Sequence, residues 1–534
     1  MQTSQESESS DTIHSLYHQP MQQIEPCCFS HISSQGTSMT YQTYNDQFFT
    51  LESSPAPGYV IYDSPSAVSI SSNRSPYSPH CSQSYLSDQH QSPEFTYGSP
   101  LSGSSMVDDG NEYGHMLREL EMKLLGPESF TDDHCNYPTP DASLAMKYNH
   151  ILQMNPGLDL KEVLLACAEA ASEAESEADM ATVNRLMDVL ERMVSVTGEP
   201  IQRLGAYMLE GIRARLISSG SVIYKNLKCK EPTSSELMSS MRVLYDICPY
   251  YKFAYTSSNV AIEEAVENEP RIHIIDFCIA QGSQWMFLMK GLARRPGGPP
   301  HIRITGVDDT DSSHARGGGL HLVGQRLSEF AESCGVPFEF HGAAMSGCKV
   351  ERDNLRVRAG EALAVNFPYM LHHMPDESVS TQNHRDRLLR LIKSFSPKIV
   401  TLLEQESNTN TASFFPRFRE TLDYYAAMFE SIDAARPRDD KQRISAEEHC
   451  VARDIVNIIA CEGADRVERH EPFGKWRSRL TMAGFTPCPL SSSVAKAVRD
   501  MLKDYSGNYG LAESYGALFL GWKNRPLSTC SAWR

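Results

Sequence analysis

The segment from Arg271 to Trp285 constrains the fold of this chain more than any other. It reads RIHIIDFCIAQGSQW, an apolar run that ends in the carboxylate Asp276 and continues through a loop into a helix-forming stretch. A buried strand, a turn and a helix form the first half of a nucleotide-binding crossover, in which glycines let the backbone approach the ligand. Gly282 is the one glycine in the loop, and its other residues are Phe277, Cys278, Ile279, Ala280 and Gln281. The segment predicts a Rossmann-like scaffold whose ligand site is degraded.

Apolar strands alternate with helices after residue 270. We expect strands at 272–277, 302–307, 338–340, 363–367, 399–403 and 517–522, with helices between them such as 320–334. This alternation predicts a parallel sheet covered on both faces, with any ligand at the carboxyl ends of the strands. Asp276, Asp308 and Asn366 end the first, second and fourth strands. They mark the crevice where a methyltransferase-type fold binds its methyl donor.

A methyltransferase that uses S-adenosylmethionine is the enzyme this crevice favours. The sequence Asn366-Phe-Pro-Tyr369 differs at one residue from the Asn-Pro-Pro-Tyr motif that grips an amino group being methylated. Bulky side chains after Asp276, however, occupy the place where the donor needs bare backbone, and such overpacking costs about 1 to 3 kcal/mol per site. We therefore expect no catalysis and no cofactor at the degraded site of Asp276, Gly282, Asp308 and Asn366. The methyltransferase remains the alternative.

Two adjacent histidines form the candidate for a metal site. His372 and His373 lie near Asp376 and Glu377. Adjacent side chains point in different directions, and the loop lacks histidines or cysteines at the ligand spacing of two to five residues. We expect no metal here and assign the histidines to solvent-exposed or capping roles. The sequence also lacks a Gly-x-Ser-x-Gly elbow, a Walker loop and a His-Glu-x-x-His motif.

The charge balance limits the contacts with nucleic acid. The formal net charge is −18, whereas phosphate binding needs clustered lysine and arginine. A transcription factor that binds DNA directly is thus a second alternative, and we expect DNA contact to be indirect. The longest apolar runs fall well short of the roughly 18 residues of a membrane span, and the polar start does not resemble a signal peptide. The 14 cysteines are scattered, so we expect an intracellular protein with reduced thiols and no membrane contact.

The amino-terminal composition differs from the rest of the chain. Residues 1–115 are rich in Ser, Gln, Pro and Tyr, and they bury too little apolar surface to offset the entropy of ordering them. We expect a disordered tail there, a short helix at 116–126, and a linker at 127–151. Six Ser-Pro pairs in the tail suit proline-directed phosphorylation, although low-complexity sequence also produces such pairs. Helical periodicity then dominates 158–262 and predicts a packed bundle.

Ordered motifs of this chain resemble those of the plant GRAS family. The VHIID signature of that family is similar to Ile272, His273, Ile274, Ile275 and Asp276. Its first leucine-rich region resembles 160–216, and its second resembles 320–334. Its PFYRE block resembles Pro416, Arg417, Phe418, Arg419 and Glu420, with Arg417 replacing Phe and Phe418 replacing Tyr. Its SAW block resembles the residues Arg466, Glu468, Arg469, Trp476, Trp522, Ser531, Ala532 and Trp533. Residues 117–127 are similar to a segment of the branch named for phytochrome A signal transduction.

The resemblance implies an α/β fold, with a Rossmann-like, methyltransferase-related core and an α-helical cap after a long disordered N-terminal region. The GRAS domain would cover 152–534, with the cap at about 158–262 and the core at about 263–534. The implied function is a plant transcriptional regulator, without enzyme activity, that acts as a protein-interaction scaffold in light or hormone and stress signalling. The implied partners are other GRAS proteins, paired through the cap, and DNA-bound factors such as zinc-finger proteins. The expected location is the nucleus, with the cytoplasm as a second site.

Specific roles follow from this resemblance. We expect Asp276 to cap the following helix or to tie its loop to a basic neighbour such as Arg419. We expect Trp476, Trp522 and Trp533 to anchor the core, because large terminal aromatics next to small residues suit packing against the sheet. We assign partner pairing to exposed charges of the cap helices, namely Arg185, Glu191 and Arg213.

Overall fold

The computed structural model describes residues 143–153, 157–217, 234–308 and 319–534. The expected tail, the short helix at 116–126 and most of the expected linker lie outside these residues. The last residues of that linker are helical instead, in α3 (Leu144–Lys147) and α4 (Asn149–Leu152). They form helices because Leu144, Tyr148 and Ile151 are buried in the core of the helical cap.

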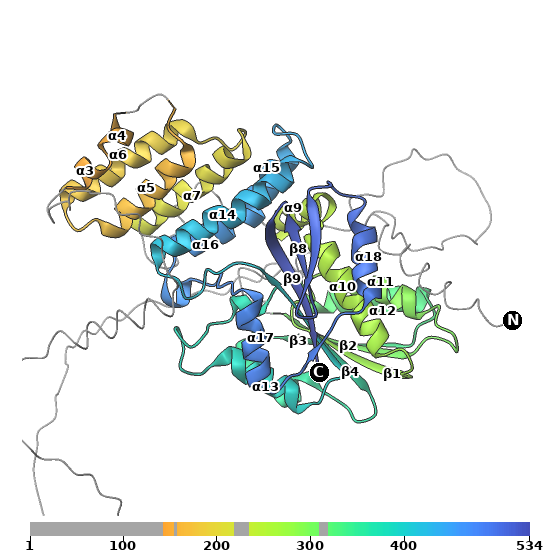
Figure 1. Cartoon of the computed structure of the whole chain (residues 1–534). Coiled ribbons are helices and arrows are strands. Elements are labelled where there is room, and N and C mark those ends of the chain that lie inside the picture. The colour runs from red at the N-terminus through yellow and green to blue at the C-terminus, as the bar shows by residue number, and fades with distance from the viewer. Residues whose placement is uncertain (1–142, 154–156, 218–233, 309–318) are drawn as a thin grey trace, which may run out of the picture. The chain divides into compact units, whose positions relative to one another are not determined.

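One mixed sheet organises the described part of the chain (Figure 1). Its strands are β1 (Arg271–Asp276), β2 (His301–Asp308), β3 (Phe338–Ala344), β4 (Ala362–Pro368), β5 (Ile399–Gln405), β6 (Pro487–Cys488), β7 (Tyr509–Ser514), β8 (Ala517–Trp522) and β9 (Arg525–Trp533). The order is β3-β2-β1-β4-β5-β9-β8-β7, with β6 paired to β9. Strands β1 to β5 are parallel, and β9 runs antiparallel to β5. The first five strands thus have the doubly wound order of a Rossmann-like half.

All six expected strands are present, and β6, β7 and β9 were not expected. The sequence of β9, RPLSTCSAW, is rich in small polar residues, yet its last seven residues are buried between β5 and β8. Its hydroxyl groups remain compatible with burial because they find acceptors there, as when Thr529 Oγ1 donates to the Glu404 carbonyl at 3.3 Å.

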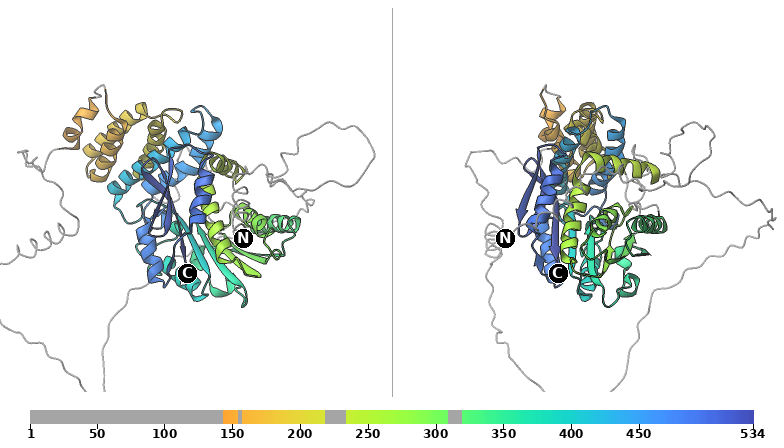
Figure 2. Two further views of the ribbon diagram at one scale, coloured as in Figure 1. Left: turned by 45° about the vertical axis from the view of Figure 1, so that its right-hand side comes forward. Right: turned by 90° about the vertical axis from the view of Figure 1, so that its right-hand side faces the viewer.

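Helices cover both faces of the sheet (Figures 1 and 2). One face packs against α10 (Tyr250–Ala265), α11 (Ser283–Leu292), α12 (Leu320–Ser333) and α18 (Ser492–Leu502). The other face packs against α13 (His384–Ser394) and α17 (Phe473–Met482). Side chains alternate across β1, so that Ile274 points into the first layer and Ile275 into the second. Both faces of the strand are therefore apolar, as the sequence of β1 predicts.

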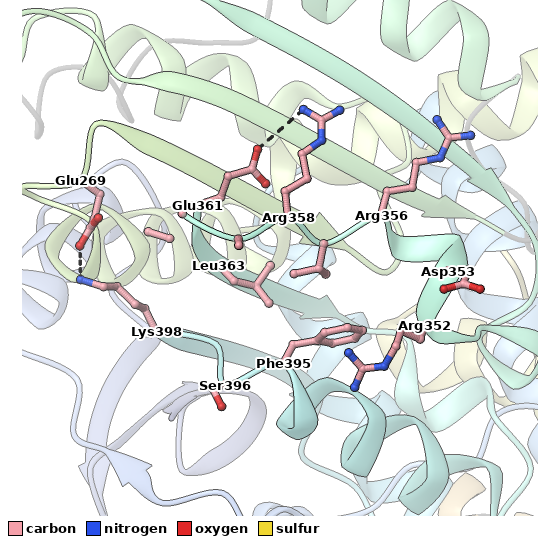
Figure 3. Close-up of a pocket in the computed structure, with 14 residues that line it drawn as sticks. Glu269, Arg352, Asp353, Arg356, Arg358, Glu361, Leu363, Phe395, Ser396 and Lys398 are labelled. Atoms are coloured by element: carbon pink, nitrogen blue, oxygen red, sulfur yellow. Dashed lines mark hydrogen bonds and ion pairs between the residues drawn. The ribbon is translucent and has the colours of Figure 1, made fainter.

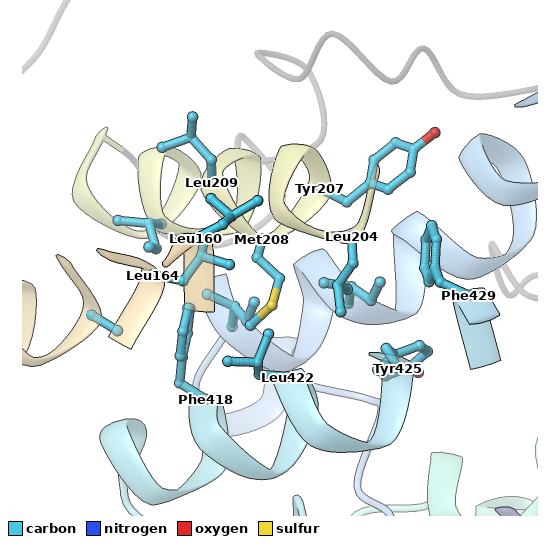
Figure 4. Close-up of a cluster of buried hydrophobic side chains, with 14 of the residues drawn as sticks. Leu160, Leu164, Leu204, Tyr207, Met208, Leu209, Phe418, Leu422, Tyr425 and Phe429 are labelled. Carbon is cyan, nitrogen blue, oxygen red and sulfur yellow. The ribbon is translucent and has the colours of Figure 1, made fainter. Parts of the chain in front are cut away.

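The helical cap is assembled from two separate parts of the sequence. The first part contains α5 (Leu160–Glu173), α6 (Glu177–Met193), α7 (Pro200–Ile217) and α9 (Ser234–Ile247), and the second contains α14 (Phe414–Asp433), α15 (Lys441–Ala446) and α16 (Ala452–Ala460). Figure 4 shows Leu164 and Met208 of the first part packed with Phe418 and Leu422 of the second. By contrast, α10 lies within the range expected for the cap but packs on the sheet.

Short helical turns complete the described structure. They are η3 (Gly347–Lys349), η4 (Arg352–Leu355), η5 (Leu371–His373), the π-helical turn η6 (Glu447–Val451) and η7 (Gly463–Asp465). None of the helices in the described part is long and apolar enough to cross a membrane.

Candidate functional site

Asp276 is held by the helix that follows its loop. Its Oδ2 accepts a hydrogen bond from the indole Nε1 of Trp285 at 2.7 Å, and both side chains are buried. The expected capping role is wrong, because the residue that precedes α11 is Gly282 and no side chain caps this helix. The expected pairing with Arg419 is also wrong, because that side chain is exposed and lies over the ring of Phe415. A buried indole N–H needs an acceptor, and Asp276 supplies it.

Burial changes the ionisation of this carboxyl group. Desolvation is the main cause that raises the pKa of Asp276 to about 7, and the charge of Asp308 acts in the same direction. The hydrogen bond from Trp285 opposes the shift. Asp308 itself is partly buried at the end of β2. The charge of Asp308 thus disfavours the charged form of Asp276.

Asn366 is committed to hydrogen bonds within the protein. Its Nδ2 donates to Gln284 Oε1 at 3.2 Å, and its Oδ1 accepts from Thr401 Oγ1 at 2.7 Å. Gln284 in turn donates to Ser258 Oγ and Asn259 Oδ1 of α10. This buried network joins β4, β5, α10 and α11, so the amide of Asn366 is already used in holding the layers together.

The crevice itself is filled by apolar side chains of the chain. A Cβ placed on Gly306 of β2 would lie 2.9 Å from Ile279, and one placed on Gly282 would lie 3.1 Å from Leu327. Phe277 stacks on Phe367 with ring centroids 4.6 Å apart. The two glycines therefore make room for the protein's own side chains.

A second polar cluster lies at the carboxyl ends of β4 and β5. His372 Nδ1 is 2.6 Å from Glu404 Oε2, and His372 Nε2 is 3.3 Å from Glu468 Oε2. His373 Nε2 lies 3.1 Å from Glu468 Oε1, and His470 Nε2 lies 3.1 Å from Glu468 Oε2. The solvent-exposed role expected for the histidine pair is wrong for His372, which is 1% exposed. Local spacing gave no signal, because Glu468 reaches the pair from a distant part of the chain.

The charges of this cluster depend on one another. Burial alone would lower the pKa of His372, but Glu404 and Glu468 raise it to about 9. Burial lowers the pKa of His470, and the charge of His372 adds to that effect. Burial opposes ionisation of Glu468, yet His373 and the neighbouring imidazoles hold its pKa well below the usual range. The imidazoles of His372 and His373 and the carboxylates of Glu404 and Glu468 therefore favour one another's charged forms.

The opening of the SAW block is a buried scaffold beneath this cluster. Arg466 donates to the carbonyl groups of Thr409 and Asn410, at 2.6 and 3.0 Å. Arg469 donates to Asn410 Oδ1 at 3.0 Å and lies 3.8 Å from Asp376. The two arginines of the motif thus bind backbone and side-chain oxygens in the interior.

The PFYRE block begins α14 and holds the second part of the cap. Phe418 is fully buried in the helical cluster, and Pro416 is exposed. Arg417 donates to the Ile458 carbonyl at 2.9 Å and pairs with Glu462. Glu420 accepts from Ser407 Oγ at 2.8 Å and from Arg525 Nη2 at 2.5 Å.

The three expected tryptophan anchors are each at most 2% exposed. Trp476 packs under Arg385, whose guanidinium lies 5.1 Å from the ring centroid. Trp522 Nε1 donates to Glu430 at 3.2 Å, and Trp533 Nε1 donates to Ser531 at 2.9 Å. In β9, Ala532 faces Thr401 of β5. These residues hold the end of the chain against the sheet.

The charged residues assigned to partner pairing lie on α6 and α7. Arg185 and Glu191 are exposed on α6. Arg213 on α7 is partly buried and forms an ion pair with Glu191. Two of the three charges are therefore already paired within the chain, and Arg185 projects from the same helix as Glu191.

A groove of about 700 Å³ lies at the opposite, amino-terminal edge of the sheet (Figure 3). Three of its four basic residues have acidic or aromatic neighbours. Lys398 pairs with Glu269, and Arg358 lies 2.9 Å from Glu339. The guanidinium of Arg352 lies 4.5 Å from the ring centroid of Phe395. The groove is thus close to charge-balanced, which is unlike the clustered positive charge of a phosphate-binding surface.

A family model described as the GRAS domain family matches residues 160–534. This chain belongs to the GRAS family. The match confirms the resemblance drawn from the VHIID, PFYRE and SAW blocks. Proteins of this family are plant transcriptional regulators.

Relatives place the GRAS chain among the scarecrow-like proteins. It is 59% identical over 541 residues to Scarecrow-like protein 13 of Arabidopsis thaliana, covering 100% of this chain and 99% of that protein. It is 56% identical over 436 residues to Scarecrow-like transcription factor PAT1 of Arabidopsis thaliana, covering 81% of this chain and 88% of that one. The crystal structure of SCL7 in Oryza sativa is 35% identical with a TM-score of 0.61, covering 71% of this chain and 100% of that one. The scarecrow-like assignment and the branch expected from 117–127 are thereby confirmed.

Proposed function

We propose that this GRAS protein regulates transcription as a non-enzymatic scaffold that recruits or modulates DNA-bound factors. The observation that carries the proposal is the filled crevice at the carboxyl ends of β1 and β2. Ile279 occupies the space beside Gly306, and Leu327 occupies the space beside Gly282. A methyl donor would have to displace buried apolar side chains there, which is costly in a close-packed interior.

The hydrogen bonds made by the polar residues of the crevice support the same proposal. Asp276 and Asn366 are positioned where an enzyme of this fold would hold a ribose or a substrate amine. Their hydrogen bonds go to Trp285, Gln284 and Thr401 instead. These hydrogen bonds hold the layers of the fold together, and this structural role of Asp276 and Asn366 requires no cofactor.

Protein partners would bind at the cap and at the core. We assign pairing with other GRAS proteins to the exposed face of α6, around Arg185 and the Glu191–Arg213 pair. We assign DNA-bound factors, including zinc-finger proteins, to the core. We also assign to this protein action in the nucleus, with a cytoplasmic pool, and a role in light or hormone and stress signalling. Its similarity to a relative named as a transcription factor supports the nuclear part of this proposal.

Calorimetry with S-adenosylmethionine tests the absence of enzyme function. We expect no binding heat when the ligand is titrated into the full-length protein, with an active methyltransferase as the positive control. Micromolar binding would support the methyltransferase alternative. The variant Ile279→Gly enlarges the crevice, and a gain of binding in this variant alone would identify Ile279 as the obstacle.

Fluorescence anisotropy with labelled promoter DNA tests whether DNA contact is indirect. The full-length protein alone should bind weakly, because its net charge is −18. Addition of a DNA-bound zinc-finger partner should bring it to the DNA. Tight binding by the protein alone, with a steep loss of affinity as salt rises, would instead support direct DNA recognition.

Charge variants of α6 and α7 test partner pairing. Arg185→Glu should weaken pairing with another GRAS protein in a pull-down or by analytical ultracentrifugation. The double variant Glu191→Arg with Arg213→Glu keeps an internal ion pair while reversing the charges shown to a partner. Lys496→Glu on the exposed side of α18 is the matched control. Pairing that is unchanged in both cap variants would exclude this face.

A further inference from the structure

The cluster at the ends of β4 and β5 has the composition and arrangement of a metal site. His372 and His373 lie in η5, immediately after β4, and Glu468 reaches them from the SAW block. Each of the three side chains offers one nitrogen or oxygen atom as a ligand, and these three atoms lie within 4.8 Å of one another. These three side chains also line a common cavity of about 100 Å³.

The distances suit a small cation with nitrogen and oxygen ligands. Zinc bonds to imidazole nitrogen and carboxylate oxygen are about 2.0 to 2.2 Å long, so neighbouring ligands of a tetrahedral ion lie about 3.4 Å apart. The measured separations from Glu468 are 3.3 Å to His372 Nε2 and 3.1 Å to His373 Nε2. Small side-chain rotations suffice to place one ion between them.

A further carboxylate is in place to orient the first histidine. Glu404 lies 2.6 Å from His372 Nδ1, and its other oxygen accepts from the backbone N–H of Leu371 at 3.0 Å. Histidine ligands of metals commonly donate their second ring N–H to a carboxylate in this way, which directs the other nitrogen at the ion. Glu404 thus directs Nε2 of His372 toward Glu468.

The composition of the cluster favours a bound cation. Three imidazoles, from His372, His373 and His470, surround the single carboxylate of Glu468, and three of these four side chains are buried. A divalent ion held by the two Nε2 atoms and Glu468 would take the place of a proton between His372 and Glu468, while His372 Nδ1–H still donates to Glu404.

The cavity leaves one coordination position open. Besides the three ligands, it is lined by aromatic residues that include Tyr250, Tyr369 and Tyr424. Its volume of about 100 Å³ exceeds the roughly 10 to 15 Å³ of cavity volume that one water needs on the same measure. A water molecule in the cavity can therefore complete a four-coordinate ion.

We propose that His372, His373 and Glu468 bind one Zn²⁺ ion, with Glu404 as a positioning residue and with the fourth ligand in the adjoining cavity. Imidazole and carboxylate ligands in this combination suit zinc, and the open position is filled by water. The site joins the end of β4 to the SAW block, and it does not depend on the function proposed above.

Metal binding to the full-length protein tests the proposal. Protein treated with a chelator and dialysed is titrated with ZnCl₂ in a calorimeter, and we expect one ion per chain. His373→Gln and Glu468→Gln should each abolish this binding. Glu404→Gln should weaken it about 10- to 100-fold, as second-sphere changes do. His341→Gln is the matched control, because this half-buried histidine lies on β3 and its Nε2 is 3.0 Å from the Asn354 carbonyl.

Cobalt spectroscopy and circular dichroism separate the possible outcomes. Co²⁺ at this site should give visible bands without the near-ultraviolet charge-transfer band of thiolate ligands. His373 is 21% exposed, so its variant should keep the circular dichroism spectrum of the folded protein. The proposal is overturned if the native protein takes up no Zn²⁺, if folded His373→Gln binds as tightly as the native protein, or if Co²⁺ reports thiolate ligands.

Discussion

Trp285 donates its indole N–H to the carboxylate of Asp276 at 2.7 Å, and the two side chains are buried between β1 and α11. The pair links the last residue of the VHIID block to the helix after the loop. It replaces the contact between a carboxylate and a ribose that this fold makes when it binds a nucleotide. The motif thus persists here as an element of structure.

The raised pKa of Asp276 predicts a pH-dependent stability. Its carboxyl group titrates near pH 7 in the folded protein, against an ordinary value of 3.8. At a pH between these two values the carboxyl group is protonated in the folded protein and ionised in the unfolded protein. Its contribution to the free energy of unfolding therefore falls as the pH rises from about 4 to about 7.

Asp276→Asn removes this titration. The unfolding free energy of the native protein minus that of the variant should fall by about 2 to 3 kcal/mol between pH 5 and pH 8. Urea denaturation at the two pH values measures it, and Asp188→Asn on the exposed side of α6 controls for loss of a carboxylate. A difference that rises with pH would contradict the direction of the shift.

Glu447→Gln should destabilise the cap strongly. Glu447 is fully buried between Arg203 of α7 and Arg443 of α15, so the change leaves the buried Arg443 without its counter-charge and leaves Arg203 with Asp433 alone. Breaking a buried pair in this way costs about 3 to 5 kcal/mol. Denaturant titration should show this loss, whereas Glu513→Gln, in an exposed pair with Arg499, should change stability by less than about 1 kcal/mol.

Gly211→Ala should separate two helices of the cap. A Cβ at Gly211 of α7 would lie 3.0 Å from two carbons of Ile459 on α16, and that branched side chain is fully buried. Overpacking of about 1 to 3 kcal/mol should exceed the gain in helix propensity. In α17, Gly474→Ala meets no atom within 4 Å and should be neutral or stabilising by about 0.5 kcal/mol. Thermal melting of the two variants provides the comparison.

Trp533→Ala should remove a main anchor of the sheet. Trp533 is 1% exposed and faces Val400 of β5 and Pro487 of β6. Its loss should cost about 3 to 5 kcal/mol in a chemical denaturation experiment. Tyr515→Ala, at a 74% exposed aromatic residue, should change stability by no more than about 0.5 kcal/mol. Equal effects of the two variants would contradict the anchoring role.

Local sequence patterns predicted the parts of the fold whose apolar residues are consecutive or periodic. The run Ile272 to Ile275 indicates a strand buried on both faces, and the structure has it in the centre of the sheet. The same reasoning missed β9, because Ser528, Thr529 and Ser531 do not look like a buried strand. It also left α14 to α16 outside the cap, since no local pattern tells a helix which distant helix it packs on.

The sequence by itself determined the family, the six principal strands and the loss of glycines after Asp276, because these depend on residue identity and short-range periodicity. Tertiary structure alone decided that Trp285 satisfies Asp276, that Ile279 fills the space beside Gly306, and that Glu468 meets His372 and His373. The contact of Trp285 spans a loop, and the contacts of Ile279 and Glu468 join residues farther apart in the chain. They arise when whole layers pack together, and the local sequence around a residue does not predict which distant residue it will contact.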